Sequence, residues 1–193
     1  MLEDLPQLIV LFVVIFDPLA SFAVFTVATA GMKAPERRRT AVYTVLAAAA
    51  LSYAILLVGE PLLHLFNVSI SDFKIAGGIV LAIFGVQMSL GHPLGQGEPK
   101  AGGSAPAIAA IIATPLLTGP AAITAIIASV SDFGMVVTGT AVTIVLLLTA
   151  ALFCLPGSLI ERIGRTPIQF MTVILGMITL AWGVRFIKEG LGF

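Results

Sequence analysis

The sequence predicts an all-α integral membrane protein: six transmembrane helices, arranged as two inverted-topology three-helix repeats, with interrupted first and fourth helices. Composition, the apolar runs and the likeness of the two halves lead to this fold class. The 193 residues are 59% hydrophobic and only 10% charged, and the mean hydropathy is +1.11. Soluble domains carry about 25% charged residues, so lipid must surround most of this chain. The net charge of zero argues against nucleic acid as a partner.

Six runs are long enough to span a membrane, which takes about 20 mostly apolar residues. We expect one transmembrane domain over residues 1–193, with repeat one at 1–92, repeat two at 104–193 and a Gly/Pro-rich loop at 91–103 between them. Cys154 lies in an apolar stretch and is expected to be a small buried residue. The predicted spans are Leu5–Ala30, Thr40–Gly59, Phe73–Leu90, Ala105–Val130, Gly134–Leu155 and Ile168–Ile187.

The basic residues predict the orientation of these spans. Lys and Arg accumulate in cytoplasmic loops. The loops after the first, third and fifth spans hold Lys33, Arg37, Arg38, Arg39, Lys100, Arg162 and Arg165, and the opposite side holds Lys74, Arg185 and Lys188. We therefore expect both termini outside and the basic loops in the cytoplasm, in the plasma (inner) membrane of a prokaryote. Arg37–Arg39 is interpreted as an orientation signal at the lipid headgroups.

The two halves of the chain resemble each other. Pro18 and Pro115 lie 97 positions apart, and superposing them brings Asp17 onto Thr114 and Ser21 onto Thr118. In the third and sixth spans the match needs a shift of one further residue: Gly78 and Gly85 correspond to Gly176 and Gly183. Small residues at such spacing let helix backbones approach closely. Because three spans is an odd number, the second half must enter the membrane upside down, as in the inverted repeats of secondary transporters.

Asp17 is the ionisable residue in the middle of a span. About a dozen apolar residues flank it on each side, which places it roughly 18 Å from either helix end and near the bilayer centre. A charge there costs at least ~3 kcal/mol, so Asp17 should face the bundle interior and be protonated or paired. Pro18 in span one, and Pro115 and Pro120 in span four, interrupt their helices.

A broken helix exposes N–H groups at one half-helix start and carbonyls at the other half-helix end. The N–H end suits a carboxylate, and the carbonyls suit an ammonium group, so a zwitterionic amino acid fits both. Backbone N–H groups beyond Pro18 and near Gly119-Pro120 would bind the carboxylate, and Asp17 would pair with the ammonium or carry the coupled proton. Ser21, Thr114 and Thr118 would orient the ligand. The candidate substrate-binding residues are Asp17, Pro18, Leu19, Ala20, Ser21, Thr114, Pro115, Thr118, Gly119 and Pro120.

At these residues the chain resembles the MarC family, which includes the SnatA-type small neutral amino-acid transporters. The family's span-four motif Pro-Leu-x-x-Gly-Pro is intact at 115–120, and 74–78 is similar to its basic-x-Ala-Gly-Gly pattern. Its span-one motif is Asn-Pro-x-Gly-x-x-Pro, where this chain has Asp17, Ala20 and Ala23 in place of Asn, Gly and the second Pro. The resemblance covers essentially the whole chain. It implies transport of glycine, alanine and similar amino acids, coupled to a proton gradient.

Two other classes of function stay open. The first is an exporter or channel of the same architecture, which gradient-driven accumulation of solute would distinguish from a carrier. The second is an intramembrane enzyme, which would need another acid, base or nucleophile deep in a span near Asp17; no Glu, His, Lys or further Asp lies there, so we rank it last and do not expect an enzyme. No Walker, Cys-pair or HExxH motif is present, so we expect neither a metal nor another cofactor. The expected partners are small neutral amino acids, protons rather than sodium, and the lipid bilayer, with a homo-oligomer left open.

Overall fold

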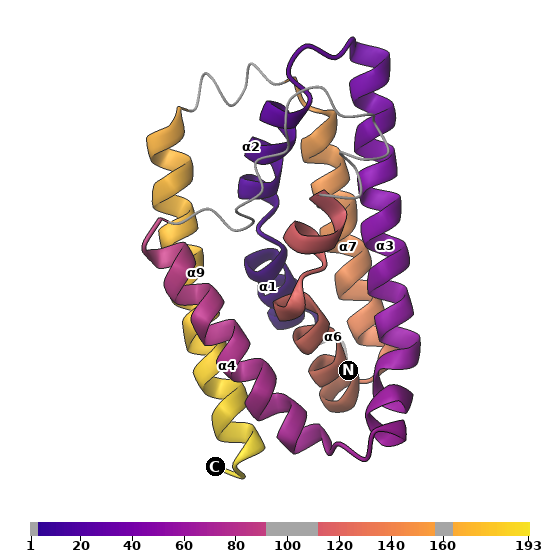
Figure 1. The fold of residues 1–193 in the computed structure, drawn as a ribbon, viewed down its shortest axis with the longest axis vertical. Coiled ribbons are helices and arrows are strands. Elements are labelled where there is room, and N and C mark those ends of the chain that lie inside the picture. Colours follow the sequence, from indigo (N-terminus) through magenta and orange to yellow (C-terminus); the bar gives the residue numbers. More distant parts are fainter. Residues whose placement is uncertain (1–3, 92–111, 157–163) are drawn as a thin grey trace.

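A computed structural model describes residues 4–91, 112–156 and 164–193 (Figure 1). Every regular element in these residues is helical. In chain order they are α1 (Leu5–Phe16), α2 (Pro18–Ala28), α3 (Ala34–Leu65), α4 (Ile70–Ser89), the π-helix η1 (Ile112–Leu117), α6 (Pro120–Phe133), α7 (Met135–Cys154) and α9 (Arg165–Gly190). The predicted loop 91–103, apart from Gly91, lies outside the described residues, as do residues 105–111 of the predicted fourth span.

The chain is an all-helical integral membrane protein with five to six apolar helices. Five helices of the described part are long and apolar enough to cross a membrane, counting α1 and α2 as one segment. The fourth predicted span is not among these five. Its described part consists of two pieces, the π-helix η1 and then α6, which has only 14 residues. The second span is longer than predicted. At 32 residues, α3 is about 48 Å long, well beyond a hydrocarbon core of about 30 Å.

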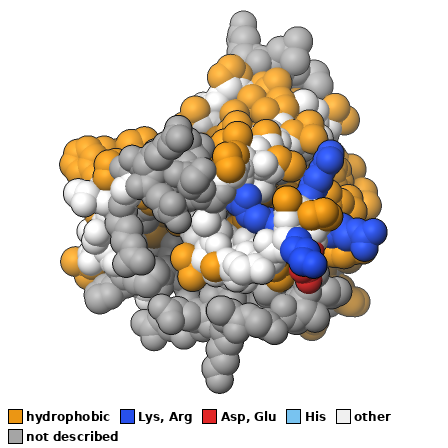
Figure 2. Space-filling view, turned by 90° about the horizontal axis from the view of Figure 1, so that it is seen from above, with side chains coloured by type: hydrophobic (Ala, Val, Ile, Leu, Met, Phe, Trp, Pro, Cys, Tyr) orange, Lys and Arg blue, Asp and Glu red, His pale blue; other side chains and the backbone are white. Residues whose placement is uncertain are grey.

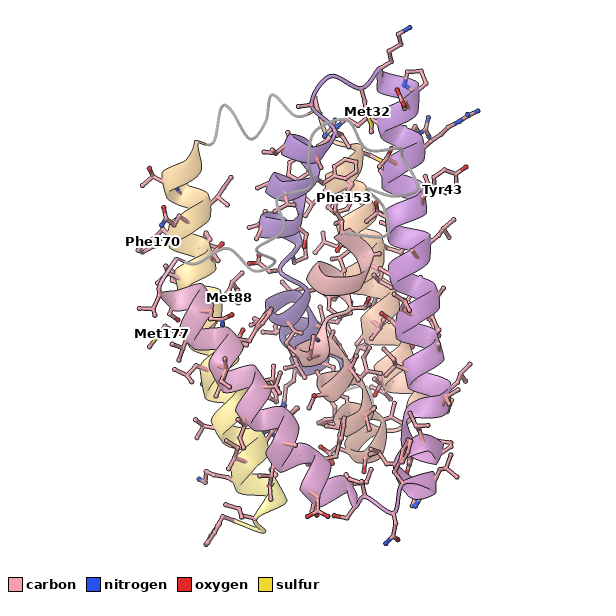
Figure 3. All side chains as sticks on the ribbon, viewed as in Figure 1. Met32, Tyr43, Met88, Phe153, Phe170 and Met177 are labelled. Carbon is pink, nitrogen blue, oxygen red and sulfur yellow. The ribbon has the colours of Figure 1, made fainter. Side chains whose placement is uncertain are left out.

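The first span occupies the middle of the bundle. Most of α1 and α2 is buried, whereas α4 and α9 expose most of their length, which suits a lipid-facing position. Figure 3 shows Phe153 of α7 pointing inward toward α2, and Tyr43 and Phe170 pointing outward. Phe153 stacks on the ring of Phe25 in α2, with 4.5 Å between centroids. The core therefore forms around the first span, α6 and α7.

Helices α4 and α9 run antiparallel and pack closely along their length (Figure 1). The approach depends on glycines: a Cβ on Gly78 would lie 2.6 Å from the carbonyl oxygen of Gly183, and one on Gly85 would lie 2.6 Å from that of Gly176. Real Cβ atoms do not come so close to backbone, so these positions require glycine. The predicted close approach at the glycines of spans three and six is present, and the two spans are each other's partners.

The basic end of the molecule lies opposite the C-terminus (Figure 1). Seen from above in Figure 2, Lys and Arg side chains gather there beside hydrophobic ones. Arg38 and Arg39 are exposed, but Arg37 folds inward. Its Nη1 donates to the carbonyl of Leu155 at 2.8 Å, its Nε donates to Thr29 Oγ1 at 3.3 Å, and its guanidinium lies over the ring of Phe25. Arg37 therefore joins the ends of α2, α3 and α7, in addition to any role as an orientation signal.

Lys74 has ion-pair partners that the sequence did not predict, and Cys154 differs from expectation. Lys74, interpreted as a charge on the side of the termini, is 8% exposed and lies in the first turns of α4. Its Nζ donates to both carboxylate oxygens of Asp132 at 2.7 Å and to Glu189 Oε2 at 3.1 Å. The burial is tolerated because α6 and α9 each supply a carboxylate.

Cys154 is exposed, so the prediction of a buried residue is wrong. It ends α7 on a face that no described helix covers.

Candidate functional site

The first span breaks at Asp17. Pro18 has no N–H to donate to the carbonyl four residues earlier, so α1 ends at Phe16 and α2 begins at Pro18. Asp17 joins them in the left-handed conformation, with φ 37° and ψ 70°, which costs Asp less than most residues. Its N–H donates to Val13 O, closing α1, and its Oδ1 accepts from the N–H of Ala20, capping α2. One residue thus ends one half-helix and begins the next.

The Asp17 carboxylate is half satisfied. Its residue exposure is 4%, and its Oδ2 is buried without a hydrogen-bond partner in the structure. Buried polar atoms of folded proteins nearly always have a partner, and an exception calls for an explanation. An unpaired carboxylate oxygen is a ready acceptor for an ammonium group or for a proton.

The fourth span breaks at Thr118 and Gly119. The π-helix η1 ends at Leu117, and α6 begins at Pro120. Thr118 N–H donates to the carbonyl of Ala113 at 3.0 Å, a five-residue step that continues the π geometry. Pro115 therefore lies within η1, and the helix is interrupted after it rather than at it. The side chains of residues 114–116 lie outside the described part, so Thr114 and Pro115 are placed by backbone alone.

The two breaks share an unusual hydrogen bond. Ser21 Oγ donates to the carbonyl of Phe16 at 3.1 Å, and Thr118 Oγ1 donates to the carbonyl of Ala113 at 2.6 Å. Both bonds reach back five residues, whereas the common Ser/Thr bond in a helix reaches back four. Donors and acceptors lie 97 positions apart, the spacing at which the prolines superpose the two halves. The Ser21 hydroxyl pairs with a carbonyl at the end of α1, and the Thr118 hydroxyl shares the Ala113 carbonyl with its own N–H.

The breaks lie next to each other. Helix η1 contacts both α1 and α2, and α1 also contacts α6. Figure 1 shows both interruptions near mid-height of the molecule, between the basic end and the C-terminal end. Asp17, Ser21 and Thr118 are each 4% exposed or less. The geometry is therefore a buried polar centre halfway through the protein.

Two half-helices begin at this centre, with their positive ends facing it. In Figure 1, α2 runs from the centre toward the basic end, and α6 runs toward the other end. The start of α2 is already capped by the Asp17 carboxylate. The start of α6 has Gly119 as its N-cap, with no side-chain hydrogen bond. Because the first N–H groups of a helix have no partner within it, the start of α6, where Gly119, Ala121 and Ala122 are buried, is the candidate anion-binding position.

The predicted site residues are thus mostly gathered in one place. Asp17, Pro18, Ser21, Thr118 and Gly119 are buried at the two breaks. Leu19 and Ala20 are half-buried in the first turn of α2, while Pro120 is exposed and contributes the start of α6 rather than a wall of the site. Sequence reasoning missed Ser52 of α3, a fully buried hydroxyl with no partner. The only signal was that Ser52 is the one serine of the second predicted span.

Known proteins resemble this chain along its whole length. The model of the family described as "MarC family integral membrane protein" matches residues 2–192. The UPF0056 membrane protein MJ1677 of Methanocaldococcus jannaschii is 34% identical, with 97% of each chain covered. The UPF0056 membrane protein YhcE of Escherichia coli is 30% identical over 97% of this chain and 93% of its own. The UPF0056 inner membrane protein MarC of Salmonella arizonae is 25% identical over 90% and 87%. No solved structure matches.

Proposed function

The chain belongs to the MarC family of integral membrane proteins, and on this premise we propose that it is a secondary transporter. It moves small neutral amino acids such as glycine, alanine and serine across the plasma membrane by alternating access, coupled to protons. The observation that carries the proposal is the buried meeting of two helix breaks. There Asp17, whose Oδ2 has no partner among the described residues, joins α1 and α2, and these helices contact α6 and η1, between which the uncapped start of α6 lies.

The two charges of an amino acid have different places in this site. Because Asp17 occupies the start of α2, the substrate carboxylate binds the free N–H groups at the start of α6, beyond Gly119. The substrate ammonium pairs with Asp17 Oδ2, the oxygen that has no partner. Thr118 and Ser21 lie at the same two breaks and orient the ligand. The nearby Ala20, Ala121 and Ala122 are small, which favours a substrate with a short side chain.

Asp17 is also the coupling group for protons. An ionised, half-paired carboxylate in the bilayer centre is costly, so Asp17 takes up a proton before the loaded carrier reorients. That proton crosses in the same direction as the substrate and is released on the other side, which couples substrate uptake to an inward proton gradient. Sodium fits less well, since the described residues around Asp17 offer a single carboxylate.

Alternating access follows from two halves related as inverted repeats. The glycine contacts of α4 and α9 support this relation. Under the correspondence of Gly78 with Gly176 and of Gly85 with Gly183, the contact Gly78–Gly183 becomes the contact Gly176–Gly85, and both are present. Such exchange is expected of a pseudo-two-fold interface. The paired five-residue hydroxyl bonds of Ser21 and Thr118 support it independently. Rocking of one half against the other would open the site to each side in turn.

The buried state of the site favours a carrier over a channel of the same fold. Asp17, Ser21 and Thr118 are each 4% exposed or less, and in the proposed mechanism a ligand bound among them leaves only after the helices move. A channel would conduct down a gradient but could not concentrate its solute. Following the basic residues, we propose that the end holding Arg38 and Arg39 faces the cytoplasm and that both termini lie outside.

The test is uptake of radiolabelled glycine into liposomes, with and without an inward proton gradient. Wild type is expected to accumulate glycine above the outside concentration when the gradient is present. Asp17→Asn keeps the size of the side chain and removes the charge, and should lower uptake at least ~10-fold and abolish its response to the gradient. Asp72→Asn is the matched control, because Asp72 is an exposed aspartate in the first turn of α4.

The outcomes separate the parts of the proposal. Gradient-driven accumulation lost in Asp17→Asn but kept in Asp72→Asn supports an amino-acid carrier with Asp17 as its coupling group. Equal uptake by all three proteins removes Asp17 from coupling and leaves the carrier. If uptake of glycine, alanine and serine by wild type matches that of empty liposomes, the proposed substrate class is wrong.

A further inference from the structure

Ser52 is a buried hydroxyl that does not use the usual way of satisfying itself. In a helix, Ser and Thr normally donate to the carbonyl four residues back. Many side chains of this protein do so: Thr26, Thr29, Thr40, Thr44, Ser89, Thr124, Thr140, Thr143, Thr149 and Thr179. Ser52 is 0% exposed, and its Oγ has no hydrogen-bond partner in the part of the chain that the structure describes. A hydroxyl kept unpaired in a helix core is poised for something absent from the structure.

The position of Ser52 along α3 can be worked out from a neighbouring contact. Gly59, two helical turns after Ser52, lies against Ile127 of α6, where a Cβ would come within 2.5 Å of the Ile127 side chain. Ile127 itself lies two turns after Pro120, the start of α6. Helices α3 and α6 run in the same direction (Figure 1). Ser52 therefore lies level with Pro120, at the depth of the break in the fourth span.

Ser52 also lies on the side of α3 that packs against other helices of the bundle, including α6 and η1. It belongs to the buried stripe of α3 that includes Ala48, Leu56 and Gly59, spaced by three and four residues. Gly59 of this stripe contacts α6, and α3 contacts η1 as well as α6. The stripe therefore faces η1 and α6, which meet at Gly119, and also α7, whose Gly139 lies against Leu56. Ser52 is the residue of the stripe at the height of Gly119.

We propose that Ser52 is a substrate-contacting residue, the third wall of the site, and that its hydroxyl donates to the carboxylate of a small α-amino acid held at the start of α6. This rests on the function proposed above and adds to it a residue outside the two broken spans. A serine hydroxyl is a compact donor, and beside the α6 N–H groups it completes the set of donors around one carboxylate. Binding of the ligand then supplies the partner that Ser52 lacks.

Ser52→Ala and Thr44→Ala give a matched comparison. Both residues are 0% exposed, on the same stripe of α3, but Thr44 donates to Thr40 O at 2.9 Å. The experiment measures glycine binding to purified protein in detergent and the thermal unfolding midpoint. Ser52→Ala should weaken binding ~10-fold or more, through loss of a bond to a charged group, with an unchanged or higher midpoint because no native bond is removed. Thr44→Ala should lower the midpoint and keep the wild-type affinity.

Each result decides a different point. Weakened binding with an intact midpoint in Ser52→Ala alone supports the inference. If Ser52→Ala binds glycine with wild-type affinity, the inference is wrong and the proposed transporter is unaffected. If wild type binds none of glycine, alanine and serine, the proposed function falls and the inference falls with it. Should Ser52→Ala fail to fold, Ser52→Cys keeps the volume with a much weaker donor. It must show the same loss of affinity, and wild-type affinity in it overturns the inference.

Discussion

The ion-pair cluster around Lys74 should hold α6 against α4 and α9, and removing its cation tests that role. Lys74 bonds Asp132 of α6 at 2.7 Å and Glu189 of α9 at 3.1 Å, and Arg185 bonds Glu189 at 2.7 Å. Lys74→Met keeps the length of the side chain and leaves Asp132 with no cation among the described residues. Glu189 would still have Arg185, so the main loss is at the α4–α6 contact.

The size of the effect follows from burial. Breaking a fully buried ion pair by removing one partner costs about 3–5 kcal/mol. Here the Lys74 side chain is 10% exposed, but those of Asp132 and Glu189 are 31% and 28% exposed, and water solvates an orphaned carboxylate in part. The expected loss is therefore about 2–3 kcal/mol. For a chain of this size that lowers the thermal unfolding midpoint by about 4–12 °C.

The assay is thermal unfolding of purified protein in one detergent, with a control and a cycle. Lys188→Met is the control, because Lys188 is exposed one residue from Glu189 and should shift the midpoint very little. The double variant Lys74→Met/Asp132→Leu removes the stranded carboxylate and should recover part of the loss. An unfolding midpoint for Lys74→Met within 1 °C of the control would refute the reasoning, because the ion pairs of Lys74 would then contribute no measurable stability.

Two further predictions concern packing and the basic end. Gly85→Ala would set a Cβ 2.5–2.6 Å from backbone atoms of α9, so we expect about 1–3 kcal/mol of destabilisation, measured as a lower unfolding midpoint. In Gly139→Ala, where the nearest atom is a leucine methyl at 3.4 Å, the midpoint should hold or rise; equal shifts in the two variants would contradict the close-packing argument. Arg37→Lys loses the forked contacts to Thr29 and the carbonyl of Leu155 and should cost about 1–2 kcal/mol. The same change at exposed Arg39 should cause no measurable loss of stability. An equal loss of stability in both variants would mean that the contacts of Arg37 do not stabilise the protein.

Features carried by single residues were predictable. The scarcity of charge predicted a membrane protein, and the long apolar runs predicted the helices, most of them to within a few residues. Asp17 and Pro18 predicted the break in the first span, because a missing N–H and a tolerated left-handed residue act locally. The glycines of α4 and α9 predicted close helix approach, since absence of a Cβ is also a local property.

Features that depend on a partner elsewhere in the chain were not predictable from the sequence. The sequence favoured Pro115 as the counterpart of Pro18, yet η1 includes Pro115 in a π turn and the helix is interrupted at Gly119. A proline can lie within a helix or end it, and the sequence near Pro115 does not distinguish the two outcomes. Lys74 looked like a charge at a span end, because its partners lie 58 and 115 residues away. Ser52 looked like an ordinary serine until its missing hydrogen bond could be seen.

The sequence by itself determined that this chain is a membrane protein. It also determined the positions of most helices along the chain and the break of the first span at an aspartate. Only the tertiary structure decided that the two breaks meet, that α4 pairs with α9, and which buried polar groups remain without partners. The physical reason is the range of the interactions. Hydropathy and backbone hydrogen bonding are properties of a residue and its neighbours in the chain, whereas close packing, ion pairing and the satisfaction of a buried hydroxyl depend on atoms that folding brings from distant segments.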